Sequence, residues 1–151
     1  MENNNEPLNP LTDSLHCLEK DFEAKKENVP KMPGMIGDFS DEHGLPMDFS
    51  TKLVIVGDEL ISNIIKHGYE EGEGIIKLRL LFDGDTRDFT IVVIDKAKPF
   101  NQLGVENPDI GTAETLNRIG GLGIHIVKKI MDECSYERKE DMNILTLKKK
   151  F

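Results

Sequence analysis

The clearest pattern of apolar and polar positions lies between residues 50 and 67. Apolar residues recur there every three or four positions, which is the period of one face of an α-helix. The pattern predicts a helix over residues 50–67, with Ser50 or Thr51 as its N-cap and Gly68 as its C-terminal stop. The apolar stripe consists of Leu53, Val56, Leu60 and Ile64, widened by Ile61 and Ile65.

Shorter apolar runs predict strands on both sides of this helix. Two of them are separated by Asp83-Gly84-Asp85, a turn that indicates an antiparallel hairpin. The last two surround a charged turn and indicate a second hairpin, whereas the first alternates only weakly, as an edge strand does. The predicted strands are residues 15–24, 75–82, 89–95, 134–137 and 143–149.

Two further helices are expected, over residues 35–43 and 122–133. Pro33 and Gly34 are expected to separate the first of them from the preceding segment. In chain order the elements are a strand, two helices, a hairpin, a long connection, a helix and a hairpin. This order predicts a two-layer α+β sandwich, with one mixed, mostly antiparallel sheet and the helices on a single face.

The length of 151 residues favours a single domain, which we expect over residues 14–151. Residues 1–13 are polar and rich in Asn, and we expect them to be disordered. The connection over residues 96–121 is too long to be incidental in a compact domain, and we expect it to be functional.

The composition argues against several classes of protein. The formal net charge of −9 argues against general nucleic-acid binding and against binding to an anionic membrane surface. No apolar run reaches the ~18 residues of a membrane span, and the first residues lack the features of a signal peptide. Cys17 and Cys134 form no CxxC pair, and no zinc-type spacing is present. The simplest expectation is a reduced, cytoplasmic protein.

The helix predicted over residues 50–67 also carries a polar stripe. Glu59, Asn63 and His67 are spaced four residues apart and therefore lie on one face, beside the apolar stripe. An acid and an amide one turn apart, at the border of the core, suit a metal and nucleotide site. For His67 we favour a structural role at the helix end, where an imidazole interacts well with the helix dipole.

Asp95 ends a predicted strand on the same side as Phe89, Ile91 and Val93. A carboxylate on the core-facing side of a strand needs a partner. Two interpretations stay open from the residues alone. Asp95 either opens the turn into Lys96, or it accepts a hydrogen bond from an amine of a ligand.

Glycines precede the last predicted helix, in the sequence Gly120-Gly121-Leu122-Gly123. Glycine lets the backbone approach a ligand closely, and the free N–H groups at a helix start favour an anion such as phosphate. The segment matches neither a P-loop nor a dinucleotide-binding pattern. Glycines before a helix are also common without any ligand, so this motif does not decide the function alone.

Together the three motifs resemble those of the GHKL ATP-binding domains of gyrases, heat-shock chaperones, sensor histidine kinases and mismatch-repair proteins. More narrowly, the chain resembles the anti-sigma-factor serine kinases of bacteria. The resemblance covers the chain from about residue 45 to its end and implies the Bergerat, or histidine-kinase-like ATPase, fold. The matching segments are residues 59–69, 95–101, 118–133, 136–138 and 143–146.

The resemblance implies roles for three of the polar residues. Asp95 would accept a hydrogen bond from the adenine amino group of ATP. Asn63 would bind the Mg²⁺ ion that bridges the phosphates, since hard cations take oxygen ligands. Glu59 would be the general base that draws the proton from an attacking hydroxyl or water.

The glycine-containing box would hold the phosphates. The resemblance implies that Gly121, Leu122 and Gly123 bring backbone N–H groups to the phosphates, and that Arg118 pairs with one of them. Residues 102–118 would act as a lid over the nucleotide.

One residue departs from the family pattern. The adenine box usually reads Asp-x-Gly, and this chain has Asp95-Lys96-Ala97. If the glycine is needed for a positive φ, Ala97 would cost about 1 kcal/mol. If only space is needed, adenine can still fit beside the extra methyl group.

The resemblance implies an ATP-dependent serine/threonine protein kinase that phosphorylates a small anti-sigma-factor antagonist. Such proteins also sequester a sigma factor, and this partner switching would require a homodimer. The alternative is a non-catalytic regulator, either nucleotide-binding or degenerate, that keeps the fold and acts by protein binding. Ala97 favours the regulator, whereas the presence of both Glu59 and Asn63 favours the kinase, because a binding module needs no general base.

Overall fold

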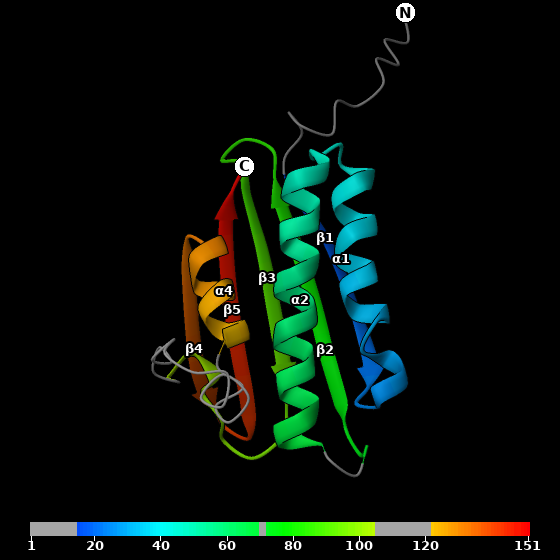
Figure 1. Ribbon diagram of the computed structural model, residues 1–151, viewed down its shortest axis with the longest axis vertical. Helices are drawn as coiled ribbons and strands as arrows, with labels where there is room; N and C mark the ends of the chain where they lie inside the picture. Colours follow the sequence, from blue (N-terminus) through cyan, green and yellow to red (C-terminus); the bar gives the residue numbers. More distant parts are fainter. Residues whose placement is uncertain (1–14, 70–71, 105–121) are drawn as a thin grey trace, which may run out of the picture.

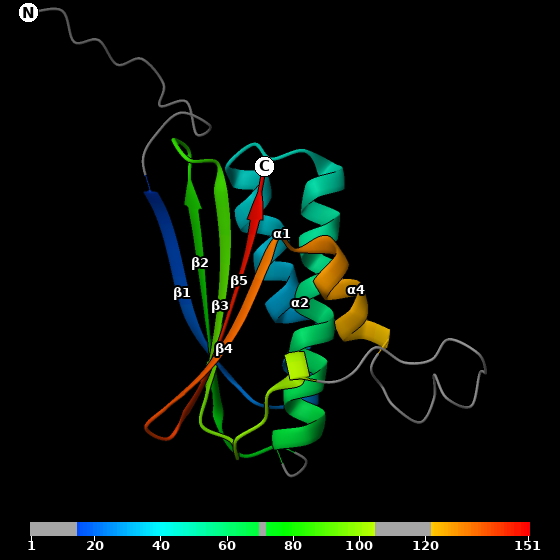
Figure 2. The same cartoon turned by 90° about the vertical axis from the view of Figure 1, so that its left-hand side faces the viewer.

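The computed structural model describes residues 15–69, 72–104 and 122–151. These residues form two layers, a five-stranded sheet and a layer of helices that covers one face of it (Figures 1 and 2). This is the α+β sandwich that the order of elements predicts. The expected disorder of residues 1–13 falls outside the described residues.

The strands pair in the order β1-β2-β3-β5-β4, and each neighbouring pair is antiparallel. Both predicted hairpins are present, and β1 lies at the edge of the sheet as expected. The strands are β1 (Leu15–Glu23), β2 (Ile75–Asp83), β3 (Asp88–Asp95), β4 (Glu133–Lys139) and β5 (Met142–Lys150).

Helix α1 (Lys31–Glu42) begins four residues before its predicted start. The expectation that Pro33 and Gly34 precede the helix was wrong. Pro33 lies in the first turn, where a backbone N–H has no partner within the helix and its loss costs little. The N–H of Gly34 already donates to the carbonyl of Pro30, at 3.2 Å.

Helix α2 (Met47–Gly68) also begins before its predicted start, with Pro46 as the N-cap residue. The predicted caps were wrong, because both hydroxyl groups are used elsewhere. The Ser50 hydroxyl donates to Asp41 at 3.3 Å, and the Thr51 hydroxyl donates to the carbonyl of Met47 at 2.8 Å.

Helix α2 ends at Gly68, the predicted C-terminal stop, although the φ of this glycine is not positive. Helix α4 (Leu122–Ile130) is shorter than predicted. The N–H of Asp132 donates to the carbonyl of Lys148 at 2.9 Å, which turns the chain into the sheet.

The core lies between the two layers. Alternate residues of β2 and β3 face the helices, and the apolar stripe of α2 packs against them. This burial fixes the rotation of α2 about its own axis. Helix α4 lies beside α2, and the polar stripe of α2 faces it (Figure 1). The buried residues of these three elements include Leu53, Val56, Leu60, Ile61, Ile64, Ile76, Leu78, Leu80, Phe82, Phe89, Ile91 and Val93. Within the described ranges, no helix has the length and apolar character needed to cross a membrane.

Candidate functional site

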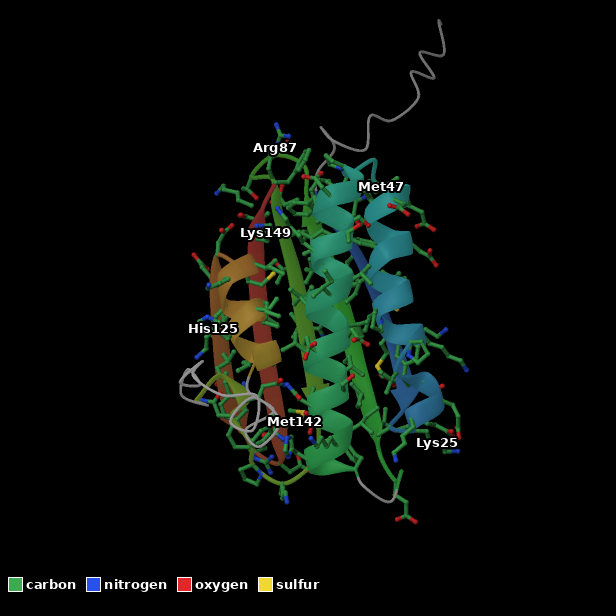
Figure 3. The ribbon with its side chains drawn as sticks, viewed as in Figure 1. Lys25, Met47, Arg87, His125, Met142 and Lys149 are labelled. Atoms are coloured by element: carbon green, nitrogen blue, oxygen red, sulfur yellow. The ribbon has the colours of Figure 1, made fainter. Side chains whose placement is uncertain are left out.

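The candidate residues gather at one end of the molecule. Asp95 is the last residue of β3, and it lies opposite Asn143, near the start of β5. Figure 3 labels Met142 at this end and Arg87 in the turn at the other end. The last turns of α2 cover the same end of the sheet (Figure 1).

A small cavity lies between these elements, with a volume of about 20 Å³. That is room for about one water molecule. A purine ring therefore enters only when side chains at the mouth of the cavity move. The lining residues are Ile64, Gly68, Asp95, Ala97, Lys98, Phe100, Gln102, Tyr136, Asn143 and Leu145.

Asp95 lies at the base of this cavity and is only 4% exposed. One oxygen of its carboxylate, Oδ1, accepts hydrogen bonds from the side-chain amide of Asn143 at 3.0 Å and from the N–H of Ala97 at 2.9 Å. Asp95 therefore makes the turn hydrogen bond of the first interpretation. The same carboxylate also faces the cavity, so the turn role does not remove the ligand role.

Asn143 holds this end of the site together, and the sequence motifs did not single it out. Its amide nitrogen donates to Asp95 and, at 3.1 Å, to the carbonyl of Lys98. Its amide oxygen accepts from the Tyr136 hydroxyl at 2.6 Å and from Arg138 at 3.2 Å. A polar residue in the core-facing register of β5 is the signal that would have found it, because it is the same signal that marked Asp95.

Tyr69 supports the turn that follows Asp95. Its hydroxyl oxygen accepts a hydrogen bond from the N–H of Lys96 at 3.0 Å. Burial raises the pKa of Tyr69, and the neighbouring Asp95 carboxylate raises that pKa further. The hydroxyl therefore keeps its proton at neutral pH.

Ala97 does not have a positive φ, since the positive φ values of described non-glycine residues are at Arg87 and Glu140. The backbone therefore does not require a glycine here, and the substitution for the usual glycine brings no strain of that kind. The remaining effect of Ala97 is steric, because its methyl group takes up space that a glycine would leave empty.

Glu59 lies directly against Gly123, the second residue of α4. A Cβ atom at Gly123 would occupy the place of the Glu59 carboxylate, whose carboxyl carbon lies 2.6 Å from that position. The free N–H groups of the first helical turn and the carboxylate of α2 are therefore neighbours. N–H groups at a helix start suit an anion, and a carboxylate suits a proton, so the two chemical features lie side by side here.

Asn63 lies one turn further along α2. Its amide nitrogen donates to the side-chain oxygen of Gln102 at 3.2 Å. The amide oxygen, which is the atom that would ligate a cation, takes no part in this bond. Gln102, expected at the start of the lid, is 4% exposed and lines the cavity.

The donor set fits a Mg²⁺ ion shared with a nucleotide better than a metal held by protein alone. The described part of the chain contains no group of three or more His, Cys, Asp or Glu side chains arranged for a metal. Mg²⁺ commonly uses one or two protein oxygens and completes its shell with water and substrate phosphates. Asn63 can supply one such oxygen.

Other predicted site residues are placed only in part. Arg118 and Gly121 lie outside the described residues, as does most of the predicted lid. Leu122 is the first residue of α4. His67 is exposed in the last turn of α2, and its ring centroid lies 4.9 Å from that of Phe100.

Comparison with known proteins identifies the family. The family model of the histidine kinase-like ATPase domain matches residues 22–149. The chain belongs to this family. The GHKL resemblance stated from the three motifs is therefore confirmed, and the family implies that this domain binds ATP.

Relatives of this histidine kinase-like domain include bacterial regulators. An anti-sigma F factor of Clostridium kluyveri is 25% identical over 140 residues, covering 89% of this chain and 94% of that protein. An anti-sigma F factor of Clostridium acetobutylicum is 26% identical over 141 residues, covering 89% and 93%. The serine/threonine-protein kinase BtrW of Bordetella bronchiseptica is 23% identical over 95 residues, covering 63% and 66%.

A solved structure supports the fold of this histidine kinase-like domain. It contains the RsbU and RsbW domains of Rv1364c from Mycobacterium tuberculosis. The superposition has a TM-score of 0.63 at 16% sequence identity, and it covers 89% of this chain and 32% of the larger one. At this identity the likeness concerns the fold alone.

Proposed function

We propose that this protein is an ATP-dependent serine/threonine kinase of the anti-sigma-factor type, whose substrate is a small anti-sigma-factor antagonist. The observation that carries the proposal is the contact between the Glu59 carboxylate and Gly123 at the start of α4. A proton acceptor lies there beside the N–H groups suited to phosphate. The similarity to anti-sigma F factors and to the kinase BtrW supports the same choice of substrate class.

The chain's own residues have distinct tasks in this transfer. Asp95 accepts a hydrogen bond from the amino group of the adenine base. The N–H groups in the first turn of α4 donate to phosphate oxygens. Asn63 offers its amide oxygen to Mg²⁺, which when bound neutralises charge on the phosphates. Glu59 takes the proton of the substrate hydroxyl while that oxygen bonds to the γ-phosphorus and ADP leaves.

The resemblance also implies a homodimer, a cytoplasmic location and a sigma factor as a second partner. These stay predictions. A kinase that binds both an antagonist and a sigma factor needs two states, and the occupied and empty nucleotide pocket would supply them.

One observation favours the alternative, a non-catalytic regulator. The cavity at Asp95 has a volume of about 20 Å³, and Asn143 already occupies an oxygen of the carboxylate. A protein that acts by protein binding alone does not need a larger cavity. The kinase needs the Glu59 carboxylate for phosphoryl transfer, whereas the regulator does not need it.

Replacing Glu59 with Gln separates the two functions. E59Q keeps the size of the side chain but removes the proton acceptor, so phosphoryl transfer should fall about 10²- to 10⁴-fold. ATP affinity should stay within about threefold of wild type, because Asp95 and Asn63 are unchanged. Transfer is measured with γ-labelled ATP and the purified antagonist proteins of the source organism, and affinity by calorimetric titration.

D58N is the matched control, since Asp58 is the neighbouring acid on α2 and is exposed. It should transfer phosphate at the wild-type rate. Wild-type transfer by E59Q would contradict the assignment of Glu59 as the base, and absence of transfer by the wild-type protein would favour the regulator.

A further inference from the structure

Gly68 has no backbone reason to be a glycine. It is the last residue of α2, and its φ lies outside the left-handed region. Alanine is the better helix former at such a position. The residue is also part of the cavity lining, so the missing side chain concerns the space in the cavity.

The space in front of Gly68 is taken by Ala97. A Cβ atom at Gly68 would lie 2.7 Å from the methyl carbon of Ala97, closer than real Cβ contacts allow. Neither side chain can rotate away from such a contact, because a methyl group has no other position. The backbone of α2 or of the turn after Asp95 would have to shift.

We propose that Gly68 and Ala97 form a coupled pair that sets the width of the purine pocket. The pocket has room for one methyl group between α2 and the turn after Asp95, and in this chain that methyl is carried by residue 97. Gly68 is thus a positioning residue for the Asp95 turn. The consequence for nucleotide binding rests on the proposed function, whereas the packing of the pair does not.

Three variants test the pair. G68A adds a second methyl group, and it should lower ATP affinity about tenfold and lower the midpoint of urea unfolding, as overpacking does. A97G removes the one methyl that fills this space, and it should lower the midpoint of urea unfolding, as loss of a packed methyl group does. The double variant G68A/A97G moves the methyl to the opposite wall and should restore both the affinity and the midpoint.

The matched control is G34A, a helical glycine at which a Cβ would meet nothing within 4 Å. Its midpoint should equal or exceed that of wild type. The readouts are calorimetric titration with ATP and Mg²⁺ and urea unfolding of the full chain without nucleotide. If the wild-type protein binds no ATP, the proposed function fails while the unfolding midpoints still test the pair. A midpoint of G68A equal to that of G34A, or a double variant no better than G68A, would overturn the coupling.

Discussion

At the scale of single residues, Asn143 organises the base of the cavity. Its side-chain amide donates hydrogen bonds to Asp95 and to a carbonyl of the turn. It accepts hydrogen bonds from the Tyr136 hydroxyl and the Arg138 guanidinium. Buried polar groups of this kind stabilise a fold only while each has its partner. Removing the amide therefore leaves several groups unsatisfied at once.

N143A should lower the free energy of unfolding by about 1–3 kcal/mol, the cost of leaving buried polar groups without partners. Urea unfolding, extrapolated to water, gives the value. S135A is the control, because Ser135 is exposed on the neighbouring strand, and it should change stability by less than about 0.5 kcal/mol. Equal stabilities of the two variants would show that the network contributes nothing.

The sequence predicted Asp95 but not Asn143, although both carry polar groups into the core-facing register. Asp95 follows an uninterrupted apolar stripe, which makes the carboxylate conspicuous. Asn143 opens its strand after a charged turn, where a polar residue is ordinary. Their pairing joins residues 48 positions apart, and only the register of β3 and β5 brings them together.

At the scale of elements, the packing of α4 beside α2 brings Glu59 against Gly123. Glu59 lies in the middle of α2, and Gly123 lies in the first turn of α4. The contact between them needs a glycine, because any Cβ would displace the carboxylate. Gly123 therefore makes room for the acid on α2, a reason for a glycine that is independent of any phosphate.

G123A tests this contact. The added methyl should push the Glu59 carboxylate aside and reduce phosphoryl transfer about 10²-fold or more, as loss of a general base does. Stability should change little, because the Glu59 side chain is flexible and alanine suits a helix. Transfer and urea unfolding are measured together, with G34A as control. Full transfer by G123A would mean that Glu59 does not act from this position.

The element boundaries show what local pattern predicts well and what it does not. The apolar stripe of α2 and both hairpins were predicted, since burial on one face dictates them. The starts of α1 and α2 were not, because Pro33 is tolerated in a first turn and the expected capping hydroxyls bond elsewhere. Those choices depend on contacts that no local pattern contains.

At the scale of the whole molecule, the two layers meet at a cavity of about 20 Å³ at one end of the sheet. Phe100 and Gln102 line its mouth, and Gln102 bonds to Asn63. A purine ring can enter only when Phe100 or Gln102 moves, whereas the amide oxygen of Asn63 takes no part in the bond to Gln102. The cost of that opening reduces the apparent affinity, so we expect moderate rather than tight binding.

Calorimetric titration of the full chain with ATP, with and without Mg²⁺, tests the central claim most directly. We predict binding that depends on Mg²⁺, with a Kd of about 1–100 μM, which corresponds to about −8 to −5 kcal/mol. We expect the dependence on Mg²⁺ because the proposed function has the amide oxygen of Asn63 bind this ion. Absence of binding at millimolar ATP would contradict the account and leave a regulator that acts by protein contact alone.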